Sequence, residues 1–159
     1  MEIFFIALVA GVIALIFAFI TARRVISEDE GSDEMKDIAR AIQEGAAAFL
    51  RREYIFLAGF VVIVAIALVV FVDYDVLDRF GEAEGELTGM PRTAIAYIIG
   101  ALASGSAGFV GMYVAVRANV RTAAKARTGL NPALRVAFSS GSVMGITVVG
   151  ISIVCITLI

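Results

Sequence analysis

Four long apolar runs divide the chain, at about residues 3–22, 54–72, 93–116 and 136–159. None of them contains Asp, Glu, Lys or Arg, and the shortest has 19 residues. A helix rises about 1.5 Å per residue, so about 20 such residues cross the roughly 30 Å hydrocarbon core of a bilayer. The pattern predicts an all-α integral membrane protein, with residues 1–159 forming one membrane domain of four transmembrane helices.

The residues before the second run also have helical spacing. Apolar side chains recur there at Met35, Ile38, Ile42, Phe49 and Leu50. Acidic residues come first and the pair Arg51 and Arg52 lies near the expected water–lipid boundary, an order that suits the helix dipole and snorkelling basic side chains. We therefore expect a long second helix whose first third stands in the cytoplasm.

The composition supports a membrane protein and excludes several kinds of chemistry. Of the 159 residues, 60% are hydrophobic, whereas soluble domains have about 45–50% apolar residues. There is no histidine, which excludes Ser–His and Cys–His nucleophiles and histidine-bound metals, and the lone Cys155 cannot make an internal disulfide or a zinc site. A formal charge of −2 argues against a nucleic-acid partner.

The basic residues predict the orientation. Six of the 13 lie in residues 23–53, five in 117–135 and two in 73–92. The positive-inside rule places the loops 23–53 and 117–135 in the cytoplasm and both the N-terminus and the loop 73–92 outside. Residues 117–127 hold four basic side chains and no acidic one: Arg117, Arg121, Lys125 and Arg127. They are either a loop that sets topology or an electropositive rim for an anionic ligand, such as a phosphorylated one.

The outer loop 73–92 is acidic, with Asp73, Asp75, Asp78, Glu82, Glu84 and Glu86. Its glycines and Pro91 favour irregular structure. We interpret it as a solvated loop, with a divalent-cation site of clustered carboxylates as the alternative.

Small residues mark helix faces in the third and fourth runs. Gly100, Ser104 and Gly108 are spaced four apart, as are Gly141 and Gly145, and this spacing lets helix backbones approach closely in lipid. Residues 105–111 superficially resemble a glycine-rich phosphate loop, but no strand precedes them. Serine hydroxyls in such helices usually donate to a carbonyl one turn earlier, while a role in an ion path stays open.

No run contains an ionisable residue at membrane depth, which ion pumps require. These helices alone are therefore not expected to pump ions. The chain stops at Ile159 within an apolar run without a polar cap, so we expect a fragment of a longer chain.

Four stretches, in order, carry a family resemblance. They are residues 43–54 (QEGAAAFLRREY), 100–112 (GALASGSAGFVGM), 118–123 (ANVRTA) and 137–145 (AFSSGSVMG). They resemble the N-terminal quarter of the membrane-bound, ion-translocating inorganic pyrophosphatases.

The resemblance implies a homodimeric pump of sixteen helices per subunit in a prokaryotic cell membrane, which hydrolyses magnesium pyrophosphate on the cytoplasmic side and moves H⁺ or Na⁺ outward. The four helices here resemble part of its outer ring. No catalytic, cofactor-binding or metal-binding residue carries over, so the ligands of Mg²⁺ are expected outside this chain. The alternative function is a self-contained four-span structural or assembly protein without catalysis.

Overall fold

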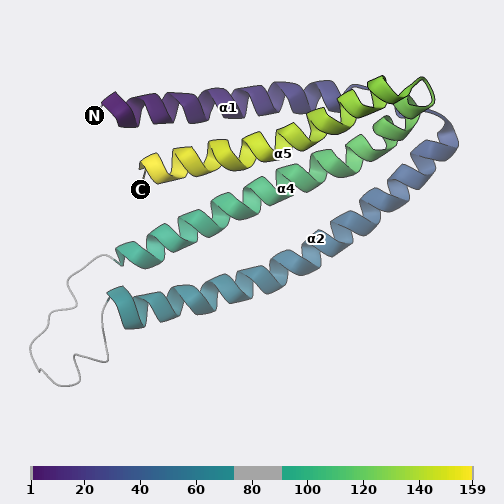
Figure 1. The fold of residues 1–159 in the computed structure, drawn as a ribbon. Coiled ribbons are helices and arrows are strands. Elements are labelled where there is room, and N and C mark those ends of the chain that lie inside the picture. The colour runs from purple at the N-terminus through teal and green to yellow at the C-terminus, as the bar shows by residue number, and fades with distance from the viewer. Residues whose placement is uncertain (1, 74–90, 159) are drawn as a thin grey trace, which may run out of the picture.

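Four long helices make up the described part of the chain, residues 2–73 and 91–158 of a computed structural model. They are α1 (Glu2–Ile26), α2 (Asp33–Leu68), α4 (Arg92–Ala126) and α5 (Leu130–Leu158), and α2 continues into a π-helical turn, η1 (Val69–Asp73) (Figure 1). Each of the four is long and apolar enough to cross a membrane. The predicted all-α fold with four candidate spans is confirmed for these residues.

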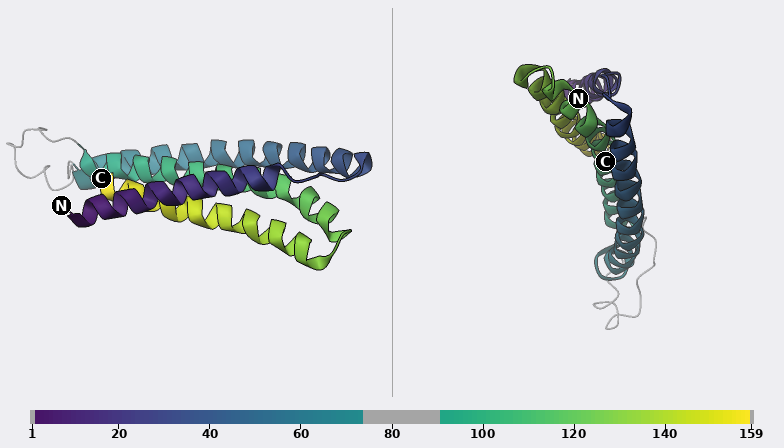
Figure 2. Two further views of the ribbon diagram at one scale, coloured as in Figure 1. Left: turned by 90° about the horizontal axis from the view of Figure 1, so that it is seen from above. Right: turned by 90° about the vertical axis from the view of Figure 1, so that its right-hand side faces the viewer.

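The helices form one curved layer rather than a closed bundle. Their order across the layer is α1, α5, α4, α2, so α1 and α2 lie at opposite edges although they are consecutive in sequence (Figure 1). Seen end-on, the layer is an arc (Figure 2). The linkers 27–32 and 127–129 lie together at one end, which we call the linker end, and Glu2 and Leu158 lie at the other.

The long second helix is confirmed, because α2 begins at Asp33 and runs without interruption into the second apolar run. Asp33 and Glu34 lie in its first turn, where negative charge interacts favourably with the helix dipole. Exposed ion pairs follow within the next two turns, from Lys36 to Asp33 at 2.9 Å and from Arg40 to Asp37 at 3.2 Å. Such exposed pairs contribute little to stability.

Residues 117–135, which we expected as a loop between spans, are almost wholly helical. The helix α4 extends to Ala126 and α5 begins at Leu130, so only residues 127–129 interrupt them. The turn uses Gly129, whose φ of +152° is unfavourable for other residues, and Pro132 follows in the first turn of α5, where its missing N–H costs no helical hydrogen bond. Apolar Ala118 and Val120 on α4 are buried, which explains why the helix continues beyond the third run.

The buried core lies where α1, α4 and α5 meet. It consists of Val25 on α1, Val114 and Ala118 on α4, and Val136 and Val143 on α5. All are small, so the three helices approach closely. This agrees with membrane packing, in which association comes from van der Waals contact rather than from burial of apolar surface away from water.

Glycines allow two close approaches. A Cβ on Gly11 would lie 3.2 Å from the carbonyl oxygen of Gly150, and a Cβ on Gly150 would lie 3.2 Å from that of Gly11, so α1 and α5 meet here backbone to backbone. On α4, a Cβ on Gly111 would lie 2.7 Å from Cγ of Met144 on α5. Substitution of Gly11 or Gly150 would push the two backbones apart, and substitution of Gly111 would displace the side chain of Met144.

The expected close approach at Gly141 and Gly145 is wrong for the described residues. A Cβ on either would have no neighbour within 4 Å, and the same is true of Gly100. Gly141 and Gly145 are exposed because α5 turns a different side, through Val143, Thr147 and Gly150, toward its neighbours. The face of α5 that packs on the described helices therefore differs from the face that carries Gly141 and Gly145.

The small-residue face predicted in the third apolar run, which lies on α4, is confirmed in part, because Tyr54 of α2 packs over it. Its hydroxyl donates to the carbonyl oxygen of Gly105 at 2.7 Å, and it would lie 3.4 Å from a Cβ on Gly108.

Side-chain hydroxyls within the helices donate to a carbonyl one turn earlier, as expected. Ser106 donates to Leu102 and Thr147 donates to Val143, each at 2.7 Å.

At the opposite end from the linkers, Asp73 caps the N-terminus of α4. Its carboxylate accepts from the backbone N–H groups of Thr93 at 3.0 Å and Ala94 at 2.9 Å. These are among the N–H donors that a helix leaves unpaired in its first turn. Pro91, at the N-cap position, has no hydrogen-bond acceptor on its side chain. Asp73 therefore ties the end of α2 to the start of α4.

We predict that Gly108→Leu destabilises the full-length protein by about 1–3 kcal/mol, because the added atoms collide with Tyr54 and displace its hydrogen bond. Gly108→Ala is the control, since its Cβ only reaches contact distance. The measurement is thermal unfolding in detergent, and a Leu variant that melts like the wild type would contradict the packing of α2 on this face.

We predict that Asp73→Ala accelerates hydrogen exchange at the amides of Thr93 and Ala94, on the order of fivefold, because both lose their acceptor. The matched control is Asp37→Ala, whose carboxylate pairs only with Arg40 on the surface and should leave these amides unchanged. Exchange is measured by mass spectrometry of peptides covering the start of α4. Equal exchange in the wild type and in Asp73→Ala would disprove the cap.

Candidate functional site

The linker end carries the most extensive polar contacts of the described residues. Arg121 of α4 is only 6% exposed and its side chain bonds to the α1–α2 linker, residues 27–32. Its Nε donates to the carbonyl oxygens of Ile26 at 2.9 Å and Glu28 at 3.1 Å. Its Nη2 lies 2.8 Å from the carboxylate of Glu30, and its Nη1 donates to the carbonyl of Arg117 at 2.6 Å. We call this set of contacts the Arg121 anchor.

A second ion pair and a tight turn hold the same linker. Lys125, one turn after Arg121, lies 2.6 Å from the carboxylate of Glu28. Within the linker, the N–H of Gly31 donates to Asp29 at 3.1 Å. Gly31 has φ +85°, and a Cβ there would lie 2.7 Å from the sulfur of Met35, so only glycine suits this position.

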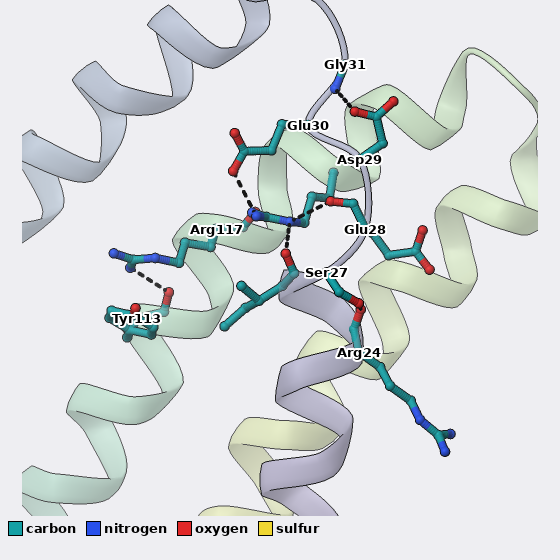
Figure 3. Close-up of polar contacts among 10 residues, drawn as sticks. Arg24, Ser27, Glu28, Asp29, Glu30, Gly31, Tyr113 and Arg117 are labelled. Carbon is teal, nitrogen blue, oxygen red and sulfur yellow. Dashed lines mark hydrogen bonds and ion pairs between the residues drawn. The ribbon is translucent and has the colours of Figure 1, made fainter.

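Arg117 lies one turn before Arg121 and has a different environment. Its guanidinium carbon lies 3.4 Å from the centroid of the Tyr113 ring, and its Nη1 donates to the Tyr113 carbonyl at 3.2 Å. Figure 3 shows its side chain pointing away from the Arg121 anchor. The stacking fixes the guanidinium beside the exposed face of α4, which carries Phe109 and Tyr113.

An open groove of about 390 Å³ runs between α2 and α4. Its lining is mostly apolar but includes two arginines, Arg51 of α2 and Arg117 of α4. The apolar part comprises Ala47, Leu50, Phe109, Met112 and Val116, together with the aromatic rings of Tyr54 and Tyr113. We call it the α2–α4 groove.

A smaller groove of about 240 Å³ lies between α4 and α5. Gly100, Ser104, Ser152 and Cys155 are among its lining residues. It has no charged side chain, so it offers no strong binding group to an ion.

The structure divides the four basic residues of 117–127 between separate environments. Arg121 and Lys125 pair with Glu30 and Glu28, so their charge is balanced within the described residues. Arg117 lies on Tyr113, and Arg127 is exposed in the turn before α5. The charges of Arg121 and Lys125 are therefore taken up within the chain, and an electropositive rim for an anionic ligand would rest on Arg117 and Arg127. The sequence signal for this outcome was the acidic stretch that begins at Glu28, which supplies both partners.

The phosphate-loop pattern in residues 105–111 lies wholly within α4. Its backbone N–H groups belong to the helix interior, where they bond to carbonyls one turn earlier and cannot cradle an anion. The interpretation of these glycines as helix-packing residues is supported instead by the contacts of Gly105, Gly108 and Gly111.

Among residues 2–73 and 91–158, no three Asp, Glu or Cys side chains gather as metal ligands would. The carboxylates of 28–30 are directed to Arg121, Lys125 and the backbone of Gly31. The alternative of a divalent-cation site in the outer loop concerns mainly Asp75, Asp78, Glu82, Glu84 and Glu86, which lie outside the described residues. The described side chains therefore do not fit a magnesium ion.

We predict that Arg121→Ala lowers the free energy of unfolding by about 3 kcal/mol, because it leaves two linker carbonyls and Glu30 without their donor. Arg121→Lys should recover only part of this, since an ammonium cannot reproduce the planar fork. Thermal unfolding of the full-length protein provides the measurement, with the exposed Arg127→Ala as control. Equal stability of the Arg121→Ala and control variants would show that the anchor is dispensable.

Comparison with known proteins extends over nearly the whole chain. A model of the family described as "Inorganic H+ pyrophosphatase" matches residues 12–159. The chain is 44% identical over 157 residues to the "K(+)-insensitive pyrophosphate-energized proton pump 2" of Moorella thermoacetica, which covers 99% of this chain and 21% of the relative. It is 38% identical over 149 residues to the "K(+)-insensitive pyrophosphate-energized proton pump" of Methanosarcina mazei, covering 94% of this chain and 20% of that relative.

A third relative is a provisionally named K(+)-stimulated pyrophosphate-energized sodium pump of Clostridium tetani. It is 44% identical over 139 residues, which are 87% of this chain and 18% of the relative. The chain thus spans about a fifth of the length of the curated relatives that it matches. Because the family match covers nearly all of its residues, the chain belongs to the inorganic H⁺ pyrophosphatase family.

Proposed function

We propose that the chain is the N-terminal part of a pump that couples hydrolysis of inorganic pyrophosphate to outward translocation of H⁺ or Na⁺. The observation that carries this proposal is 44% identity across 99% of the chain to a relative named as a pyrophosphate-energized proton pump. The described helices supply no nucleophile with a base and no cluster of metal ligands. In the proposed pump they are framework, and the remaining helices carry the chemistry.

The proposed reaction needs groups that this part of the chain does not gather. Mg²⁺, when bound, neutralises phosphate charge and orients the pyrophosphate for attack by water. We propose that the rest of the pump supplies carboxylate ligands for Mg²⁺ and an ionisable residue at membrane depth. A homodimer is part of the same proposal.

We further propose that the linker end faces the cytoplasm and the N-terminus lies outside. Eleven of the 13 basic residues fall in residues 23–53 and 117–135. Both segments include the linkers at one end of the layer (Figure 1). One orientation thus satisfies the positive-inside rule for all four helices.

The first measurement is to read the coding DNA beyond the codon for Ile159. An open frame encoding further spans, with clustered Asp and Lys at a helix end, supports the pump. A stop codon supports instead the alternative of a four-span structural protein.

We predict that inverted membrane vesicles containing the full-length protein accumulate H⁺ or Na⁺ when pyrophosphate and Mg²⁺ are added. Chelation of Mg²⁺ should abolish both ion uptake and phosphate release, because the negative charge on the phosphate oxygens is then not neutralised during the attack of water. The measurements are a pH-sensitive dye, ²²Na⁺ uptake and a phosphate assay. Vesicles from cells without the protein are the control, and hydrolysis without transport of either ion would refute the pump.

A further inference from the structure

The α2–α4 groove combines an apolar lining with two cationic groups, and this combination matches one kind of ligand. We propose that it binds an anionic phospholipid, whose phosphate lies against Arg51 and Arg117 and whose acyl chain extends into the bilayer along Met112, Phe109 and the ring of Tyr54. This inference rests on the proposed orientation of the chain in a membrane, but it does not depend on pyrophosphate hydrolysis.

The charge of the groove is available to a ligand. Neither Arg51 nor Arg117 forms an ion pair with a carboxylate within residues 2–73 and 91–158, in contrast to Arg121 and Lys125. Arg117 is also held in position by the Tyr113 ring at 3.4 Å. A guanidinium presents several N–H donors in a plane and binds phosphate oxygens in pairs, so a fixed one is well suited to a phosphate.

The position of the groove in the sequence suits a lipid headgroup. Arg51 lies three residues before the predicted span 54–72 and Arg117 one residue after the span 93–116. Arginine and tyrosine are favoured at this boundary, where one end of the side chain is apolar and the other reaches the headgroups. On the proposed orientation the groove opens to the cytoplasmic leaflet, whose lipids carry negative charge.

The side chains of the open face of α4 favour a lipid over another helix. Phe109 is 52% exposed and Tyr113 43% exposed on the face that lines the groove. Close helix packing in membranes uses small residues, and on α4 the small buried residues Ala107 and Gly111 face elsewhere, with Gly111 against Met144 of α5. Exposed, bulky aromatic side chains beside a groove fit an acyl chain instead.

The test is a titration of the purified full-length protein, monitored by native mass spectrometry, with dioleoyl phosphatidylglycerol and with dioleoyl phosphatidylcholine. We expect the wild type to bind phosphatidylglycerol about tenfold more tightly, because the two guanidiniums favour the anionic headgroup. The double variant Arg51→Gln/Arg117→Gln should lose this preference. The matched control Arg52→Gln/Arg127→Gln removes the same charge outside the groove and should keep it.

A second variant separates binding from folding. Ala47→Phe leaves both arginines in place but fills the groove, so it should weaken binding of phosphatidylglycerol while the protein still elutes as the wild type in size-exclusion chromatography. Three outcomes overturn the proposal: equal binding of both lipids, equal loss in the control double variant, or displacement of phosphatidylglycerol by millimolar inorganic phosphate. The last would show a site for a free anion.

Discussion

The arrangement of the helices depends on the contact between Arg121 and the α1–α2 linker. Because α1 and α2 occupy opposite edges of the layer, the six residues 27–32 must cross the end of α4. Arg121 donates to the carbonyl of Ile26, the last residue of α1, and to that of Glu28 in the linker, while it neutralises Glu30. One guanidinium thus joins the end of α1 to the linker and fixes the path to α2, which positions α1 on α5 and α2 on α4.

Local sequence properties predicted the helices but not their neighbours. Apolar runs and helical spacing are properties of a single segment, so the four spans and the early start of α2 at Asp33 could be predicted. The pairing of faces is a property of two segments. Gly141 and Gly145 have the spacing of a packing face, yet Gly150 is the residue that meets Gly11. Small-residue spacing shows where an approach is possible and does not identify the partner helix.

The same limit applies to the basic residues near the linker end. Arg117 and Arg121 are separated by one helical turn and look equivalent in the sequence, but one is stacked on Tyr113 beside an open groove and the other is buried. What distinguishes them is Glu30, which lies 91 positions before Arg121. Only the crossing of the linker over α4 brings this carboxylate within reach, so neither the anchor nor the α2–α4 groove could be derived from spacing.

A single layer of membrane helices has two broad faces, and this constrains what it can do. Large apolar side chains such as Phe60 and Phe138 are 60% and 71% exposed, while the ion pairs lie at the linker end. Lipid tails can cover apolar surface, but a path for ions needs polar or ionisable groups enclosed by protein at membrane depth. The described spans contain no charged residue there. A layer of this kind can therefore form a wall beside an ion path, and the path of the proposed pump must be lined by other helices.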